Sequence, residues 1–277
     1  MSSRRTRIIA ALIMAPFAIG AVYYLPTPYL AAAVAAILLT GLWEWSALAG
    51  LTEKIPRSLY VAGNALMMLA LAWGSTGRGL FLYLLISLIG AAWWIVVCLW
   101  LWKFDFAKQD TSINRSIKLL AGSLSVIPAW CALAYLHQDP ETGPRWALFA
   151  LAIAWAADSG AYFAGVRYGK HKLAPRISPG KSWEGVIGGV VAILLLAVVA
   201  TPLLGLFWPE LGELILLTLV TMFFSVIGDL FESLMKRHSG HKDSSDLIPG
   251  HGGLMDRLDS LLAVLPIFVI GKSWLEL

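Results

Sequence analysis

The sequence predicts an all-α integral membrane protein with about nine transmembrane helices. Hydrophobic residues make up 58% of the 277 residues, whereas charged residues make up only 14%. Soluble domains carry about 25% charged residues, so the charge here is low. Several apolar runs reach the roughly 20 residues that a helix needs to cross a hydrocarbon core of about 30 Å. The short alternating segments of a transmembrane β-barrel do not occur in the sequence.

Each expected helix is an apolar run bounded by polar residues. The run after the basic N-terminus is longer than a signal peptide's, and its cleavage signal at Ala18 and Gly20 is weak, so we expect a retained first helix. The third run is short and the last contains Lys272, which leaves a count of eight open. Hydropathy places the spans at about 8–25, 29–49, 59–75, 80–102, 118–137, 146–166, 186–207, 211–231 and 258–275.

The distribution of Lys and Arg sets the orientation of these spans. Of the 21 basic residues, only Arg78, Arg145 and Lys272 lie on one side of the predicted membrane. All the others fall in the N-terminal segment or in alternate loops of the opposite side. Because basic loops stay in the cytoplasm, the N-terminus is predicted to be cytoplasmic. The pI of about 9.1 then reflects orientation and anionic headgroups, and no nucleic-acid partner is expected.

Charge also divides the chain into two regions. Residues 1–145 hold five spans whose single acidic residue is Glu44, and we expect them to pack and to face lipid. Glu44 lies near a cytoplasmic helix end, where solvation is the expected role and a supporting role in the site stays open. Residues 146–277 carry acidic residues in the spans and two polar cytoplasmic loops, 167–185 and 232–257. The chemistry is therefore predicted to lie in the second region.

The end of the eighth span carries polar residues at helical spacing. Asp229, Glu232, Ser233 and Lys236 share one face if the helix continues past the apolar run. A carboxylate just inside the membrane is costly unless it is paired or binds a cation. A simple pairing of Asp229 with Lys236 is the competing interpretation.

The ninth span opens with two more carboxylates, Asp256 and Asp259. They could merely complement the helix dipole. With Asp229 from the preceding antiparallel helix, however, three carboxylates converge. Carboxylate oxygens are the ligands that Mg²⁺ prefers, often together with substrate phosphates. We therefore predict a metal site at Asp229, Asp256 and Asp259.

The loop between these two spans combines glycines with cationic side chains. Its glycines allow a close backbone approach to phosphate oxygens, and its basic residues are phosphate ligands. An ordinary basic cytoplasmic loop is the alternative, but the interleaved acids Asp243 and Asp246 argue against it. For His251, phosphate positioning, proton donation and turn capping all stay open. The predicted phosphate ligands are Lys236, Arg237, Lys242 and Arg257.

Two further segments are candidates for substrate binding. Asp158 lies inside the sixth span, where an ionisable residue is a functional candidate, although an interhelical hydrogen bond would also explain it. The stretch SPGKSWEG offers Lys181 and Ser182 as ligands for a nucleoside triphosphate. It is not a P-loop, because Pro175 stands where the first glycine is required and no strand is expected before it.

One long signature connects these residues. It reads S-x-x-K-R-x(4)-K-D-x-S-x-x-x-P-G-H-G-G-x-x-D-R-x-D and runs from Ser233 to Asp259. This pattern closely resembles the signature of the phosphatidate cytidylyltransferases, also called CDP-diacylglycerol synthases. The segments SPGKSWEG and DSGAY are similar to parts of that family as well. The signature covers about a tenth of the chain, but it has many fixed positions.

The resemblance implies that phosphatidic acid and CTP are converted to CDP-diacylglycerol and pyrophosphate with Mg²⁺, and with a second cation left open. It further implies a homodimer in a bacterial inner membrane whose site faces the cytoplasm. On these expectations Asp229 and Asp256 bind Mg²⁺ and Asp259 supports them. Asp243 orients a lysine or a metal-bound water, and Lys181 and Ser182 contact the CTP phosphates.

The residues also bear on three other functions. An ion-coupled transporter could carry protons on Asp158 and Asp229, but transporters place their sites near the midplane between internal repeats, and no repeat is evident. A CDP-alcohol phosphotransferase would need a D-G-x-x-A-R core, which the sequence lacks. A noncatalytic scaffold would not need converging carboxylates beside a basic glycine loop.

Overall fold

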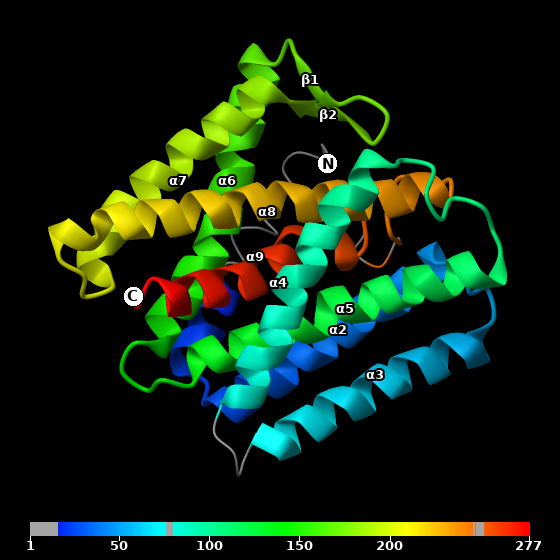
Figure 1. Cartoon of the computed structure of the whole chain (residues 1–277), viewed down its shortest axis with the longest axis horizontal. Helices are drawn as coiled ribbons and strands as arrows, with labels where there is room; N and C mark the ends of the chain where they lie inside the picture. The colour runs from blue at the N-terminus through cyan, green and yellow to red at the C-terminus, as the bar shows by residue number, and fades with distance from the viewer. Residues whose placement is uncertain (1–15, 76–79, 246, 248–251) are drawn as a thin grey trace.

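The computed structural model describes residues 16–75, 80–245, 247 and 252–277. Residues 16–24 are helical, and long helices make up most of the remainder (Figure 1). The helices are α2 (Thr27–Leu48), α3 (Lys54–Ser75), α4 (Phe81–Trp102), α5 (Ser112–His137), α6 (Gly143–Tyr168), α7 (Trp183–Leu203), the 3-10 turn η1 (Trp208–Glu210), α8 (Leu211–His238) and α9 (Met255–Trp274). The strands are β1 (Lys172–Ala174) and β2 (Ser178–Ser182).

The predicted all-α membrane architecture is confirmed, while the count of nine spans stays a prediction. Within the described ranges, seven helices, α2 to α8, are long and apolar enough to cross a membrane. α9 has 20 residues but carries charges at both ends. Much of the first predicted span, 8–25, lies outside the described residues.

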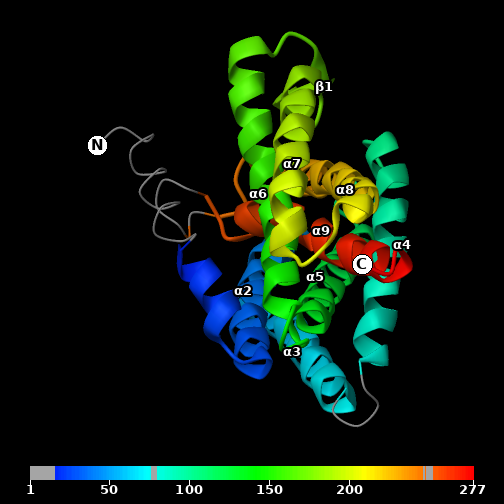
Figure 2. The same ribbon diagram turned by 90° about the vertical axis from the view of Figure 1, so that its left-hand side faces the viewer.

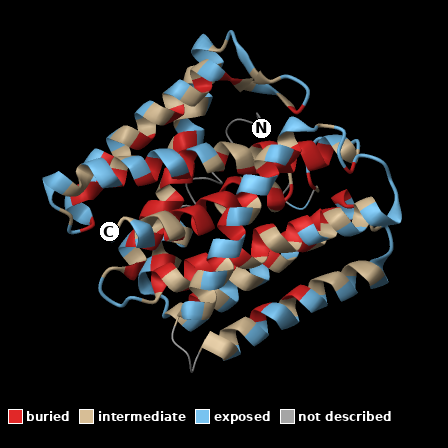
Figure 3. Cartoon of the chain, in the orientation of Figure 1, coloured by how far each residue is buried: buried red, intermediate tan, exposed pale blue. Residues whose placement is uncertain are grey.

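α5 and α9 form the centre of the molecule. α5 packs against α2, α4 and α9, and the burial colours are densest there (Figure 3). α3 lies on the outside of the bundle, with few buried residues (Figure 1). A cross-membrane bundle of this kind buries its central helices in protein and leaves the outer faces of the others to lipid.

α6 and α7 form a closely packed antiparallel pair (Figure 2). A Cβ atom added at Gly160 would lie 2.5 Å from the carbonyl oxygen of Gly188, which only glycine avoids. Gly165 likewise faces Gly185. Small residues let membrane helices approach this closely, so Gly160 and Gly188 explain the tight packing of α6 on α7.

The two halves of the chain are joined by an aromatic cage around Phe231 of α8. Trp45 of α2 and Trp93, Trp94 and Trp100 of α4 place their rings within 6.0 Å of the Phe231 ring, centroid to centroid. Aromatic pairs at this separation are worth about 0.5–1.5 kcal/mol each beyond the area they bury. The cage fixes α8 against the N-terminal helices.

The loop between α6 and α7 contains a β-hairpin that the sequence did not lead us to expect. β1 pairs antiparallel with β2, with Lys172 opposite Ser182. A strand therefore does precede Gly-Lys-Ser, contrary to the expectation, but the tripeptide itself belongs to β2. A P-loop is still excluded, because Pro175 stands where the first glycine is required and a strand, not a glycine-rich turn, leads into the helix start at Ser182.

The hairpin contacts two neighbouring polar segments of the chain. Arg237 Nε donates to the carbonyl oxygen of Ile177 at 3.1 Å, and Arg176 contacts Asp105 at 3.4 Å. His238 Nε2 lies 2.6 Å from the carbonyl oxygen of Phe104. Three of the basic segments predicted to be cytoplasmic thus meet at one end of the bundle.

Candidate active site

α8 continues as helix to His238, which brings its polar residues onto one face as predicted. The Ser233 hydroxyl donates to Asp229 Oδ1 at 3.4 Å, one turn away. Lys236 forms an ion pair with Glu232, also one turn away. The competing interpretation, a pairing of Asp229 with Lys236, is not observed, because Asp229 has another partner.

Lys236 is the centre of the first charged cluster. Its ammonium group contacts Glu232 of the same helix and lies 2.5 Å from Asp256 Oδ1 of α9. The other oxygen of Asp256 accepts hydrogen bonds from Ser244 N and Oγ at 3.0 Å and from Gly253 N at 2.8 Å. All three charged side chains are largely buried. The cluster therefore ties α8, α9 and the signature loop together.

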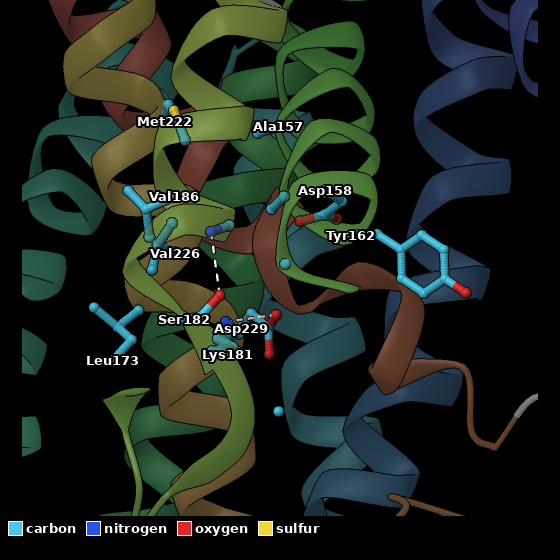
Figure 4. A pocket seen from close by; sticks show the side chains of 14 residues that line it. Ala157, Asp158, Tyr162, Leu173, Lys181, Ser182, Val186, Met222, Val226 and Asp229 are labelled. Atoms are coloured by element: carbon cyan, nitrogen blue, oxygen red, sulfur yellow. Dashed lines mark hydrogen bonds and ion pairs between the residues drawn. The ribbon is translucent and has the colours of Figure 1, made fainter. Parts of the chain in front are cut away.

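A second cluster faces a cavity of about 290 Å³ between α6, α7 and α8 (Figure 4). Lys181 Nζ of β2 lies 2.6 Å from Asp229 Oδ2, and both side chains line the cavity. Asp158 of α6 lines it as well, so the intramembrane acid faces a cavity, as a functional role requires. The apolar part of the wall includes Met222 and Val226. The cavity is thus polar at one side and apolar at the other.

Ser182 is placed differently from a free phosphate ligand. It is buried and is the N-cap of α7, with its Oγ accepting a hydrogen bond from Gly185 N at 3.2 Å. Ser, Thr, Asp and Asn are the preferred residues at this position. Its side chain lines the cavity (Figure 4), and its predicted contact with CTP stays a prediction.

Acidic residues of both clusters lie within electrostatic range of one another, and we call them the carboxylate row. Asp158, Asp229 and Asp259 are within range of one another, and Glu232 is within range of Asp259 and Asp256. Five carboxylates thus lie near two ammonium groups, Lys181 and Lys236. In a low-dielectric environment such an excess of negative charge favours cation binding.

The three predicted metal ligands, Asp229, Asp256 and Asp259, do not all face one another. Asp229 and Asp259 lie in the row close enough to interact, whereas both oxygens of Asp256 already accept contacts from Lys236 and the loop. Among the described residues, no three carboxylate, imidazole or thiol groups form a ready metal cluster. Buried Glu232 nevertheless has an oxygen, Oε1, without a hydrogen-bond partner in these residues. The donor set fits a hard cation, and metal binding stays a prediction.

The remaining predicted ligands that the structure describes do not line the cavity. Lys242, Asp243, Arg237 and Arg257 are exposed, which leaves them accessible to a soluble ligand. The Nε atom of Arg237 already donates a hydrogen bond to the carbonyl oxygen of Ile177. His251 lies outside the described residues. The roles predicted for these side chains stay predictions.

Glu44 has a larger role than interface solvation, which was the expected one. Its carboxylate is 3% exposed and accepts hydrogen bonds from the loop and from the start of α9. A second carboxylate that sequence reasoning did not assign is Glu232. Its spacing to Lys236 was a usable signal, whereas Glu44 contacts residues about 200 positions away, which no local pattern reveals.

The fold and the site define a class of protein. It is a helical integral membrane protein in which acids and lysines from α6, β2, α8 and α9 gather beside the basic loops. Such a site is suited to anionic phosphates held together with cations. Residues 5–273 match the sequence model of the cytidylyltransferase family, and the chain belongs to that family.

Curated relatives carry a more specific name. A protein of Pseudomonas aeruginosa named phosphatidate cytidylyltransferase is 39% identical over 264 residues, covering 95% of each chain. One of Haemophilus influenzae with the same name is 36% identical over 288 residues, covering 95% of this chain and 96% of the relative. A Bacillus subtilis protein of that name is 46% identical over 126 residues, 46% of each chain. The family predicted from the signature is confirmed.

Proposed function

We propose that this chain transfers a cytidylyl group from CTP to phosphatidic acid, giving CDP-diacylglycerol and pyrophosphate. The observation that carries the proposal is the match to proteins named phosphatidate cytidylyltransferase along 95% of the chain. The match to the cytidylyltransferase family model, residues 5–273, spans all five residues of the carboxylate row. An ion-coupled transporter would not be expected to match the cytidylyltransferase family along almost its whole length.

The reaction suits the chemistry of these residues. An oxygen of the phosphatidic acid phosphate attacks the α-phosphorus of CTP, a new P–O bond forms, and the bond to the β-phosphate breaks to release pyrophosphate. No strong general base is needed, because the second pKa of a phosphomonoester is about 6. The main demand is to hold two anionic reactants together, which lysines and cations meet by neutralising charge.

The chain's own groups divide this work. Lys181, on the cavity wall, would bind a phosphate oxygen, and its contact with Asp229 would orient the ammonium group. Exposed Arg237, Lys242 and Arg257 would attract the triphosphate from the solvent side. The apolar wall at Met222 and Val226 would accept the first carbons of the lipid next to its headgroup.

Mg²⁺ is the cofactor we propose, held by Asp229 and Asp259 of the carboxylate row. The acidic excess of the row supports this assignment, and Asp256 would join if it exchanged Lys236 for the cation. When bound, Mg²⁺ would neutralise phosphate charge and stabilise the leaving pyrophosphate. The same excess leaves room for a second cation.

We further propose a homodimer in a bacterial inner membrane, with the site facing the cytoplasm. The clustering of basic segments beside the site supports this orientation. CTP is a cytosolic metabolite, which fits a site on that side. Chemical cross-linking in native membranes would test the dimer.

Purified protein in detergent should release pyrophosphate only when phosphatidic acid, CTP and Mg²⁺ are all present. The lipid product, identified by mass spectrometry, should be CDP-diacylglycerol. Each component is omitted in turn as the control. Folded protein that gives no CTP-dependent product under varied lipid and cation conditions would contradict the proposal.

A further inference from the structure

Glu44 lies in the half of the chain without other acidic residues inside its spans, yet its carboxylate contacts the signature loop and the start of α9. We infer that Glu44 is a positioning residue, which holds the signature loop and the start of α9 so that Asp256 and Lys236 keep their orientation. This inference rests on the proposed function, because its main readout is cytidylyl transfer.

Four donors converge on the Glu44 carboxylate. Oε1 accepts from Ser245 Oγ at 2.6 Å and from Leu254 N at 3.0 Å. Oε2 accepts from Ser244 Oγ at 2.9 Å and from Met255 N at 2.8 Å. A buried carboxylate is costly unless it is hydrogen-bonded, and here each oxygen has two donors.

Two of these donors belong to the N-terminus of α9. The first backbone N–H groups of a helix have no partner within the helix, and the helix dipole favours an anion there. α9 has no side-chain cap of its own from Leu254. Glu44, supplied from α2, takes that place, so the position of α9 along its axis depends on a residue of the other half of the chain.

The hydrogen bonds continue from Glu44 to the charged cluster. Ser244 Oγ lies 2.9 Å from Glu44 Oε2 and 3.0 Å from Asp256 Oδ2, so its single hydroxyl proton is shared between the two carboxylates. Asp256 in turn contacts Lys236. The path from Glu44 to Lys236 therefore passes through one serine and one aspartate.

The same spot requires glycine at position 253. A Cβ atom there would lie 2.5 Å from Glu44 Oε2 and would also collide with Ser244 Oγ. The loop backbone must pass this close for Gly253 N to reach Asp256. The signature's second consecutive glycine is thus explained by the approach to Glu44.

Glu44→Gln is the test variant because it keeps the shape of the side chain. Its amide can donate to whichever serine hydroxyl it faces, since a hydroxyl also accepts. One backbone N–H of Leu254 or Met255 then loses its acceptor, and the loop shifts. A misplacement of about 1 Å at a catalytic group can cost about 100-fold in rate.

The experiment compares purified full-length wild type, Glu44→Gln and the matched control Glu53→Gln, which changes an exposed acid just after the same helix. We measure kcat, KM for CTP and the thermal unfolding midpoint. Glu44→Gln should lower kcat about 10- to 100-fold per folded molecule, with KM for CTP within about twofold of wild type. Glu53→Gln should match wild type.

Ser245→Ala keeps the test decisive if Glu44→Gln does not fold. It removes one donor to Glu44, together with the acceptor of the exposed Leu247 N–H, and leaves the carboxylate, Ser244 and both backbone donors in place. We expect a kcat about threefold lower with an unchanged unfolding midpoint, and no further loss when it is combined with Glu44→Gln, since Ser245 acts through Glu44.

Two results would overturn the inference. One is a wild-type kcat per folded molecule in Glu44→Gln; the other, if that variant is unfolded, is a wild-type kcat in Ser245→Ala. Wild-type protein that makes no CDP-diacylglycerol would instead contradict the proposed function. The unfolding midpoints separate a loss of folded protein from a loss of turnover.

Discussion

The two lysines of the site differ in what surrounds them. The side chains of Lys236, Glu232 and Asp256 are 11%, 3% and 10% exposed, whereas those of Lys181 and Asp229 are 23% and 30% exposed. The first group joins α8, α9 and the loop. The second lines a cavity. Two lysine–carboxylate contacts of similar length thus have different surroundings, one buried between α8, α9 and the loop and one at the cavity wall.

The difference in exposure sets the difference in energy. Removing one partner of a buried ion pair leaves an uncompensated charge and typically costs about 3–5 kcal/mol. A partly exposed pair is screened by solvent and contributes less to stability. Changes at Lys236 should therefore act on folding and activity together, while changes at Lys181 or Asp229 should act mainly on activity.

The largest effect is expected from Lys236→Met. The change leaves Glu232 and Asp256 buried without their cation, which should destabilise the fold by about 3–5 kcal/mol and abolish turnover. Thermal unfolding of the purified protein measures the first effect and product formation the second. Lys103→Met, at an exposed lysine, is the control. A Lys236→Met protein as stable as wild type would show that the buried cluster is not architectural.

Asp229→Asn should reduce activity strongly without reducing stability. The amide keeps the shape but removes the charge next to Lys181, and we expect kcat at least about 100-fold lower, as for loss of one preorganised electrostatic contact. Titrating Mg²⁺ over the assay should show weaker activation than in wild type. Asp105→Asn, at an exposed carboxylate, should retain activity. Normal Mg²⁺ activation in Asp229→Asn would contradict its assignment to the metal.

Lys181→Met should have a smaller effect that falls on substrate binding. Loss of the ammonium group should raise KM for CTP by about 10- to 100-fold, since one hydrogen bond to a charged group is typically worth about 1.5–3 kcal/mol. Its effect should be non-additive with Asp229→Asn, because the two groups touch. Initial rates at several CTP concentrations provide the measurement. An unchanged KM for CTP would remove Lys181 from the nucleotide site.

The smallest effect is expected at the exposed contact of Arg176 with Asp105. The hydrogen bond from Lys108 and the charge of Arg176 hold the pKa of Asp105 below its ordinary value. The stabilisation is thus present at neutral pH and is lost as the pH falls through the folded pKa of this carboxyl group. Arg176→Ala should lower the unfolding midpoint only slightly at neutral pH, and the difference should shrink in acid. A large change would mean that the hairpin contributes to global stability.

Part of this site was predictable because it follows local rules. Helical spacing placed Asp229 and Lys236 on one face, and the charge asymmetry of the loops matched the end where the hairpin, Asp105 and Arg237 meet. The pairings were not predictable. Lys236 pairs with Asp256, and Lys181 pairs with Asp229. The second pairing arises because a hairpin of only eight strand residues carries Lys181 to α8, and no periodicity in the sequence predicts such short strands.

The aromatic cage around Phe231 has a consequence for protein engineering. Phe231 lies between Asp229 and Glu232 in the sequence of α8, and its ring packs against tryptophans of α2 and α4. A rotation of α8 about its own axis, which would change the direction of Asp229 and Glu232, would also break the ring contacts of Phe231. A fragment that keeps only α6 to α9 would retain the whole carboxylate row. It would lose the tryptophans of α2 and α4 that fix the orientation of α8. Chimaeras between relatives should therefore exchange α2, α4 and α8 as one unit.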